Sequence, residues 1–307
     1  MKHNSKSTLT RSKSRAKSTK AFSPIHAIVP TRLIPDFRGP KGEKTTVAIG
    51  WHVDGETGIL AADQRSAQHI TALGEAAYGV STALPRILQM HRDTGVPGSF
   101  FVPGYVCDCY PREIGAIASA GYEIAHHGYL HENCFTLTDK QERSAFNKGI
   151  KSIKQVYGRA PAGWSAPSWG VKPSTMDLIK ELGMLYDCSL MEYDTPYVLS
   201  TEHGELIELP TSMILDDWEI YGGSPYPGSG INAPADLAFQ IWREEFDALR
   251  HYGGLFATTF HPNLTGRPGR LRMMYGLIEY MQQFSADVWF ATCEEVALQA
   301  QKILQKA

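Results

Sequence analysis

The sequence predicts an α/β protein with a largely parallel sheet or barrel. From about residue 45, short apolar runs typical of strands alternate with longer segments whose apolar residues recur every three or four positions, as in helices. No internal repeat is present, and no apolar run reaches the roughly 18 residues of a membrane span. The expected strands lie at 45–53, 98–103, 122–126, 184–188, 205–210, 254–260 and 287–292.

Helix signals separate several of these strands. Thr138 and Gln141 form a capping box ahead of a helical apolar face. Ser174 is suited to begin the next helix, which should end at Gly183. The segment 235–252 has helical periodicity and is followed by two glycines, which are typical of a helix end. Strands and helices therefore alternate, as expected of βα units.

The chain joins a basic tail to an acidic body. It has 307 residues, 43% hydrophobic and 20% charged, which suits a globular protein with a large core. Residues 1–35 contain no acid, and 22 of the 30 bases remain for the rest of the chain against 32 acids. We expect residues 1–40 to be a disordered basic extension and 41–307 one domain; an organelle transit peptide is the alternative for the tail.

Composition also bears on partners and location. The N-terminus lacks the apolar stretch of a secretory signal, so we expect a cytoplasmic protein with no membrane association. The acidic body disfavours nucleic-acid binding. The five cysteines are scattered and include no C-x-x-C pair, which indicates neither a disulfide framework nor a cysteine zinc cage.

Polar residues follow the first expected strand. Because side chains alternate along a strand, Gly50, His52 and Asp54 share one face. That face becomes polar only at its carboxyl end, where α/β enzymes place catalytic groups. A hydrogen-bonded loop anchor is the alternative interpretation of this pattern alone.

Two histidines follow the strand at 122–126. His127 and His131 are four residues apart, a spacing that lets both imidazoles reach one ion, whereas the adjacent His126 should point away. With Asp54 they would form a metal site of two histidines and one carboxylate, with positions left open for water and substrate. Solvated histidines are the alternative.

Two further segments carry polar groups at strand ends. His261 ends an apolar run and is followed by Arg267, and the acidic pair Asp216 and Asp217 follows the strand at 205–210. The acidic pair is suited either to orient a histidine or to cap a loop. Trp164, Trp169 and Trp218 are candidates to line a pocket or to pack in the core.

In this order, from about residue 45 to 300, the segments resemble the polysaccharide deacetylase (NodB homology) superfamily. Asp54 matches its metal-binding aspartate, and EIAHHGYLHE looks like its H-[ST]-x-x-H motif. GWSAPSWG stands where its R-x-P-[YW] motif belongs, and LDDWEIY and FHPNLTGRPGR look like its last two motifs. The chain is most similar to the branch of peptidoglycan deacetylase-like proteins, cyclic imide hydrolases and metal-independent allantoinases.

The resemblance implies a distorted (β/α)7 barrel that hydrolyses a non-peptide carbon–nitrogen bond in an amide, an imide or an N-acetyl sugar. It implies a divalent metal, Zn²⁺ with Co²⁺ or Ni²⁺ as alternatives, held by Asp54, His127 and His131. His261 would be the general acid, oriented by Asp216 or Asp217. Trp164, Trp169, Trp218 and Arg267 are the candidates to bind substrate. Relatives in this branch imply a homo-oligomer, commonly a tetramer.

The chain departs from the family at the catalytic base. The family's base is an aspartate adjacent to the metal aspartate or two residues before it, and that second place holds His52. The arginine that steadies the base is replaced by Ser165. We predict that His52 is the base or orients water, with Glu56 as the competing candidate; a role for His52 as fourth metal ligand stays open. The alternative function is a non-catalytic barrel that binds a ligand.

Overall fold

The computed structural model describes residues 29, 31–34, 36–222 and 233–306. Most of the basic tail, residues 1–28, and residues 223–232 lie outside the described residues. Strand β1 (Thr31–Leu33) falls within the extension expected at 1–40, yet it pairs with β8 (Tyr197–Thr201) in antiparallel fashion. The end of that segment therefore belongs to the folded domain.

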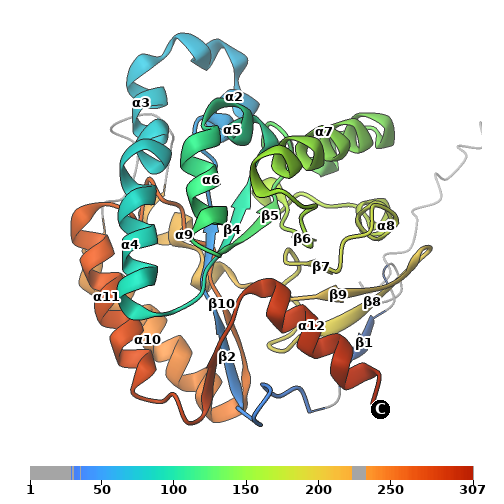
Figure 1. The fold of residues 1–307 in the computed structure, drawn as a ribbon, viewed down its shortest axis with the longest axis vertical. Coiled ribbons are helices and arrows are strands. Elements are labelled where there is room, and N and C mark those ends of the chain that lie inside the picture. The colour runs from blue at the N-terminus through green and yellow to red at the C-terminus, as the bar shows by residue number, and fades with distance from the viewer. Residues whose placement is uncertain (1–28, 30, 35, 223–232, 307) are drawn as a thin grey trace, which may run out of the picture.

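A curved sheet carries most of the strands (Figure 1). Six of its members are parallel along the order β9-β7-β6-β5-β4-β3, and β8 and β1 extend it in antiparallel fashion. This arrangement confirms the predicted α/β class. The parallel members are β3 (Gly50–His52), β4 (Ser99–Val102), β5 (Glu123–His126), β6 (Gly163–Trp164), β7 (Tyr186–Asp187) and β9 (Gly204–Glu208).

A smaller parallel sheet has the order β10-β2-β11, formed by Gly254–Ala257, Thr45–Ala48 and Val288–Phe290. Strands β2 and β3 are separated by one residue, so a single extended segment takes part in both sheets. Isolated bridges from Trp51 to Phe260 and from Asp216 to Thr259 continue the ring of parallel pairing. The result is an incompletely closed barrel whose strand ends converge on one side.

Helices surround the strands (Figure 1). The capping box of α7 and the last residue of α10 match the prediction, but α8 begins at Pro173, so the start expected at Ser174 is slightly late. No described helix is both long and apolar enough to cross a bilayer. The helices are α2 (Thr57–Ala62), α3 (Ile70–Tyr78), α4 (Leu84–Thr94), α5 (Gly104–Cys109), α6 (Pro111–Ser119), α7 (Asp139–Tyr157), α8 (Pro173–Glu181), α9 (Asp217–Tyr221), α10 (Ala235–Tyr252), α11 (Pro268–Gln282) and α12 (Cys293–Leu304).

The extended segment formed by β2 and β3 separates two parts of the core. Val47, Ile49 and Trp51 are buried against residues of α4, α10 and α11, whereas Ala48 packs with Phe101 in a second cluster. This is the alternation predicted for the strand, and full burial of Trp51 contributes about 2–3 kcal/mol. The same alternation directs His52 and Asp54 to the end of the barrel, where they line a cavity.

Candidate active site

A cavity of about 410 Å³ opens where the parallel strands end. Its polar wall combines side chains from four separate segments of the chain. Helices α2 and α3 and the segments after β6 and β9 supply the rest of the wall. The polar residues brought together are His52, Asp54, His127, His131, Asp216 and His261.

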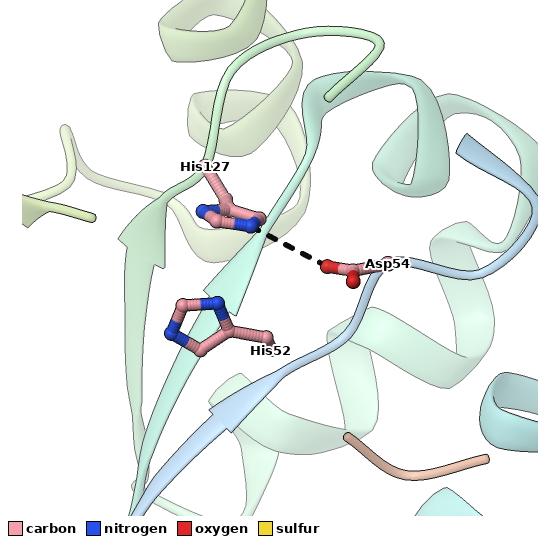
Figure 2. Close-up of side chains that lie close together, drawn as sticks. All are labelled: His52, Asp54 and His127. Carbon is pink, nitrogen blue, oxygen red and sulfur yellow. Dashed lines mark ion pairs between the residues drawn. The ribbon is translucent and has the colours of Figure 1, made fainter. Parts of the chain in front are cut away.

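Asp54 lies among three imidazoles. Its Oδ1 is 3.5 Å from Nε2 of His127, and its Oδ2 is 3.6 Å from Nε2 of His131 and 3.6 Å from Nε2 of His261. Figure 2 shows the Asp54 carboxylate directed toward the ring of His127. The residues predicted to hold a metal are thus gathered in one place.

The orientation of His127 indicates what lies between it and Asp54. Its Nδ1–H donates to the carbonyl oxygen of Ser165 at 2.7 Å, which leaves Nε2 as an acceptor with a free lone pair. Both Nε2 of His127 and Oδ1 of Asp54 are buried, and neither has a hydrogen-bond partner. Two buried acceptors that face each other are unfavourable unless a cation lies between them. These residues therefore fit a divalent metal.

His52 lies beside the same pair. Its ring centroid is 4.4 Å from that of His127, and one of its nitrogens falls within a group of His52, Asp54 and His127 ligand atoms that are all within 4.8 Å of one another. Burial, followed by the charges of His127 and His261, lowers the pKa of His52 well below its usual value. The ring is therefore a neutral imidazole able to accept a proton or to bind a metal.

Glu56 does not share this cavity. Its carboxylate accepts a hydrogen bond from the hydroxyl of Tyr110, and Glu56 is absent from the cavity wall, whereas its neighbours Asp54 and Gly55 belong to it. The prediction of Glu56 as a competing base is wrong for this arrangement, because Gly55, with φ of 52°, turns the chain between the two carboxylates.

His261 is held by Asp217. Its Nδ1–H donates to Oδ1 of Asp217 at 2.6 Å, and its backbone N–H and the hydroxyl of Thr265 also donate to the same carboxylate. Burial disfavours the charged ring, but the carboxylates of Asp217, Asp54 and Asp216 outweigh burial and raise the pKa of His261 to about 10. A protonated His261 can therefore present its Nε2–H to the cavity.

The acidic pair thus has two different roles. Asp217 is fully buried and orients His261, whereas Asp216 accepts a hydrogen bond from the backbone N–H of Trp218 and caps the N-terminus of α9. Its Oδ1 lies 3.9 Å from Nδ1 of His261, beyond hydrogen-bond range. Of the two alternatives for the orienting carboxylate, the structure favours Asp217.

Of the four residues predicted to bind substrate, two line the cavity and two do not. Trp169 and Trp218 line the cavity as expected. Trp164 has no exposed surface and packs beside Phe146 at a ring distance of 5.1 Å, so the prediction that it binds substrate is wrong. It occupies the last position of β6, where its side chain points into the core rather than toward the cavity.

Arg267 also has another role. Its Nη2 lies 2.5 Å from Oε2 of Glu75, and its guanidinium covers the ring of Tyr78. It therefore holds α3 against the loop of His261 and does not line the cavity, which corrects the prediction of direct substrate contact. Sequence reasoning missed Glu75, Ile59 and Ala76 in the wall, because α2 and α3 carry no motif.

Unusual backbone conformations gather at the cavity. Four described non-glycine residues have positive φ, and three of them line the wall: His131 at 57°, Ser168 at 52° and Trp169 at 55°. Each costs roughly 1–2 kcal/mol, a strain typical of functional sites. Neither residue type nor spacing revealed this feature in the sequence.

The fold and the site define an α/β barrel with a candidate metal centre and a histidine–aspartate pair at the strand ends. The chain belongs to the polysaccharide deacetylase family. The family model for polysaccharide deacetylases matches residues 75–186. The structure of a Mycobacterium smegmatis protein assigned as a polysaccharide deacetylase is 38% identical, with a TM-score of 0.85 and coverage of 90% of this chain and 96% of the other.

Two further relatives differ in the activity their names state. The peptidoglycan deacetylase of Helicobacter pylori is 29% identical and aligns with 73% of this chain and 86% of its own length. The crystal structure of Puue allantoinase is 24% identical, with a TM-score of 0.75 and coverage of 89% of this chain and 97% of the other. At that identity the second likeness shows the fold alone.

Proposed function

We propose that this protein is a metal-dependent hydrolase that removes the acetyl group from an N-acetylated sugar. The observation that carries the proposal is the pair of buried, unpartnered acceptors, Oδ1 of Asp54 and Nε2 of His127. The family and the peptidoglycan deacetylase of Helicobacter pylori support an acetylated carbohydrate as substrate.

Asp54, His127 and His131 would hold the metal. One carboxylate and two imidazoles suit Zn²⁺, with Co²⁺ or Ni²⁺ as alternatives. When bound, such an ion polarises an amide carbonyl and lowers the pKa of a water molecule. The carbonyl of Ser165 helps by keeping Nε2 of His127 unprotonated and directed at the site.

His52 and His261 would move the protons. His52 is neutral and lines the cavity, so it can take a proton from the attacking water. The bond between the carbonyl carbon and the amide nitrogen breaks, and His261 gives its Nε2 proton to the departing nitrogen. The products are acetate and the free amine of the sugar. Asp217 keeps His261 protonated and orients its ring.

A direct test measures metal content and acetate release together. Purified protein should hold about one divalent ion per chain and release acetate from N-acetylglucosamine oligomers. Asp54→Asn should lose both, whereas Asp63→Asn, which alters a carboxylate paired with Arg65 outside the cavity, should keep both. Full metal binding by Asp54→Asn would contradict the proposed site. A metal-free and inert native protein would favour the non-catalytic barrel.

Small cyclic imides are the second candidate substrate. Much of the cavity wall is apolar, with Ile59, Ala62, Ala76, Trp169 and Trp218, and such a wall suits a compact ring. Adding succinimide and hydantoin to the same assay distinguishes the two, because an imide hydrolase would turn over these rings and release no acetate. We further propose a cytoplasmic homo-oligomer, to be tested by cell fractionation and analytical ultracentrifugation.

A further inference from the structure

We propose that Ser189 and Asp187 position the imidazole of His127, the proposed metal ligand, through the peptide group between Ser165 and Ala166. These two side chains and this peptide group are called the relay below. The inference rests on the proposed metal centre and adds two residues that do not line the catalytic cavity. Asp187 ends β7, and Ser189 follows it by two residues.

The first part of the relay is a single peptide group. Its carbonyl oxygen, which belongs to Ser165, accepts Nδ1–H of His127 at 2.7 Å. Its N–H group, which belongs to Ala166, donates to Oγ of Ser189 at 2.8 Å. A hydrogen bond at one end of an amide polarises the amide and strengthens the hydrogen bond at its other end. The hydroxyl of Ser189 therefore makes the carbonyl of Ser165 a better acceptor for His127.

The second part of the relay is a buried carboxylate. The hydroxyl of Ser189 donates to Oδ1 of Asp187 at 2.7 Å. When Asp187 is ionised this bond is charge-assisted, and such bonds are about twice as strong as those between neutral groups. Both side chains are buried, so bulk water does not compete for the hydroxyl. The negative charge of Asp187 thus acts on His127 through successive hydrogen bonds.

Glu208 keeps that charge on Asp187. The two residues are register partners in the pairing of β7 with β9, and Oε1 of Glu208 accepts the backbone N–H groups of Ser189 and Leu190. Oε2 of Glu208 and Oδ2 of Asp187 receive no donor from the other described residues, and a proton on Glu208 satisfies both oxygens. Burial and the charge of Asp187 raise the pKa of Glu208 well above its usual value. Burial raises the pKa of Asp187 only to about 6, so Asp187 is the ionised member at neutral pH.

The relay supplies what a directly bonded carboxylate supplies in other metal sites. A metal-binding histidine donates its second nitrogen to a carboxylate or a backbone carbonyl, which fixes the tautomer and makes the ring a stronger ligand. His127 donates to a carbonyl, and the relay places a carboxylate behind that carbonyl. Nε2 of His127 faces Oδ1 of Asp54 at 3.5 Å. A stronger hydrogen bond at Nδ1 therefore increases the affinity of Nε2 for a cation.

Ser99 provides a matched control, because it has the same surroundings at the other end of the barrel. Its hydroxyl donates to Oε2 of Glu123 at 2.6 Å and accepts the backbone N–H of Cys293 at 2.8 Å, and its side chain is fully buried. Replacing either serine by alanine removes one hydroxyl that joins a buried carboxylate to a buried N–H group. The two substitutions should therefore affect folding alike, and only Ser189→Ala should affect His127.

The experiment has two readouts besides activity. The Kd for Zn²⁺ is measured by competition with a chromophoric chelator, and the Nδ1–H signal of His127 is measured by heteronuclear NMR on the metal-free protein. His127→Gln assigns that signal by its loss. The variants are Ser189→Ala, Ser189→Thr, which keeps a hydroxyl, and Asp187→Asn, which keeps an acceptor without the charge. Ser99→Ala is the control, and urea unfolding of the metal-free proteins compares stability.

We expect Ser189→Ala to raise the Kd for Zn²⁺ about tenfold or more, the usual effect of removing a group that supports a metal-binding histidine. The Nδ1–H signal of His127 should move to higher field, because the hydrogen bond to Ser165 weakens. Ser189→Thr should bind zinc within about twofold of the native protein, and Asp187→Asn should weaken binding about threefold. Ser99→Ala should match the native protein in both readouts, although its urea midpoint falls as far as that of Ser189→Ala.

Equal effects of the two alanine variants on zinc affinity would overturn the proposal, because both substitutions remove the same kind of buried hydrogen bond. An unchanged Nδ1–H signal in Ser189→Ala would also overturn it. If Ser189→Ala does not fold, Asp187→Asn decides the question by the same two readouts, and native values for both would reject the relay.

The same measurements separate the relay from the proposed function. A native protein that binds zinc but releases no acetate would reject the deacetylase, and the zinc affinities would still decide the role of Ser189. A native protein that binds no zinc would reject the proposed metal centre. The Nδ1–H signal then decides alone: a shift in Ser189→Ala that is absent from Ser99→Ala supports the positioning of His127, and equal signals overturn it.

Discussion

Glu123 and Asp54 are carboxylates at opposite ends of the barrel, and their surroundings differ in one respect. Glu123 begins β5 and is fully supplied with donors: Oε1 accepts from the hydroxyl of Tyr186 at 2.7 Å, and Oε2 accepts from the hydroxyl of Ser99 and the backbone N–H of Glu294. Asp54 follows β3 and has a buried oxygen with no donor.

The difference separates a structural group from a ligand. Burial raises the pKa of Glu123, opposed by its hydrogen bonds from Ser99 and Tyr186, and the group joins β4, β7 and the start of α12. Oδ1 of Asp54 has no such donor and instead faces Nε2 of His127, which is also an acceptor. A buried carboxylate oxygen that faces another acceptor is suited to a cation, whereas a carboxylate surrounded by donors holds the fold together.

The largest expected effects come from replacing each of these two carboxylates by alanine. Asp54→Ala should lower kcat more than about 1000-fold, as expected when a metal ligand is removed, and change the free energy of unfolding of the metal-free protein by less than about 1 kcal/mol. Glu123→Ala should instead cost about 3 kcal/mol, because three donors lose their acceptor. Urea unfolding and acetate release on both variants check the comparison. A strongly destabilised Asp54→Ala would contradict it.

The next effect concerns pH. Asp217 is a major reason for the raised pKa of His261, so Asp217→Asn should lower that pKa. A general acid works only below its pKa, and the alkaline loss of kcat should therefore begin at lower pH in Asp217→Asn than in the native enzyme. Rate profiles from pH 6 to 10 measure this shift. Identical alkaline limbs would show that His261 is not the acid. Asp194→Asn, outside the cavity, is the control.

Asp187 and Glu208 form a buried pair of acids whose supply of hydrogen-bond donors lies between those of Glu123 and Asp54. Burial raises the pKa of Asp187 to about 6, and burial with the charge of Asp187 raises the pKa of Glu208 well above its usual range. Oε1 of Glu208 accepts the backbone N–H groups of Ser189 and Leu190. Because the protonated forms are favoured in the fold, their stabilisation is complete below about pH 4 and is lost as pH rises through about 6.

Substitutions at Glu208 test this pair. Glu208→Gln keeps the acceptor and can donate to Asp187, so it should change the unfolding free energy at pH 7 by less than about 1 kcal/mol. Glu208→Ala should cost about 2–3 kcal/mol, because two backbone donors are left unpaired. Urea unfolding at pH 4, 5, 6 and 7 should show a smaller decline with pH in Glu208→Gln than in the native protein. An equal decline of the unfolding free energy with pH in both proteins would show that this pair is not the source of the pH dependence.

The smallest effect comes from the backbone. Ser168 has φ of 52°, a region that glycine adopts without strain, so Ser168→Gly should raise the unfolding free energy by up to about 1 kcal/mol. Ser81→Gly, in a helical segment, should lower it by about 0.5–1 kcal/mol. Thermal unfolding compares the two. Destabilisation by Ser168→Gly would mean that its side chain matters more than its backbone.

The sequence predicted the location of site residues well where a local pattern also determines the place of a residue in the fold. Alternation along a strand places Asp54 at a strand end, and parallel pairing brings the ends of neighbouring strands together, so Asp54, His127 and His261 could be gathered before any coordinates. The α/β class followed from the same patterns, and the barrel from the family resemblance.

Side-chain direction was harder to predict. Glu56 and Trp164 are each within two residues of a cavity-lining position, yet one turns to Tyr110 and the other into the core. Arg267 pairs with Glu75, which is distant in sequence and belongs to a helix without any motif. These outcomes depend on packing between distant segments, and a single sequence carries little trace of such packing.

The position of β2 between β10 and β11 has a consequence for biosynthesis. The segment that leads to Asp54 leaves the ribosome early, but its two hydrogen-bonded neighbours are more than 200 residues further along the chain. Contacts of such long range slow folding. The nascent chain must therefore keep this apolar segment from aggregating until β10 and β11 have also been synthesised, which makes chaperone assistance during expression a practical concern.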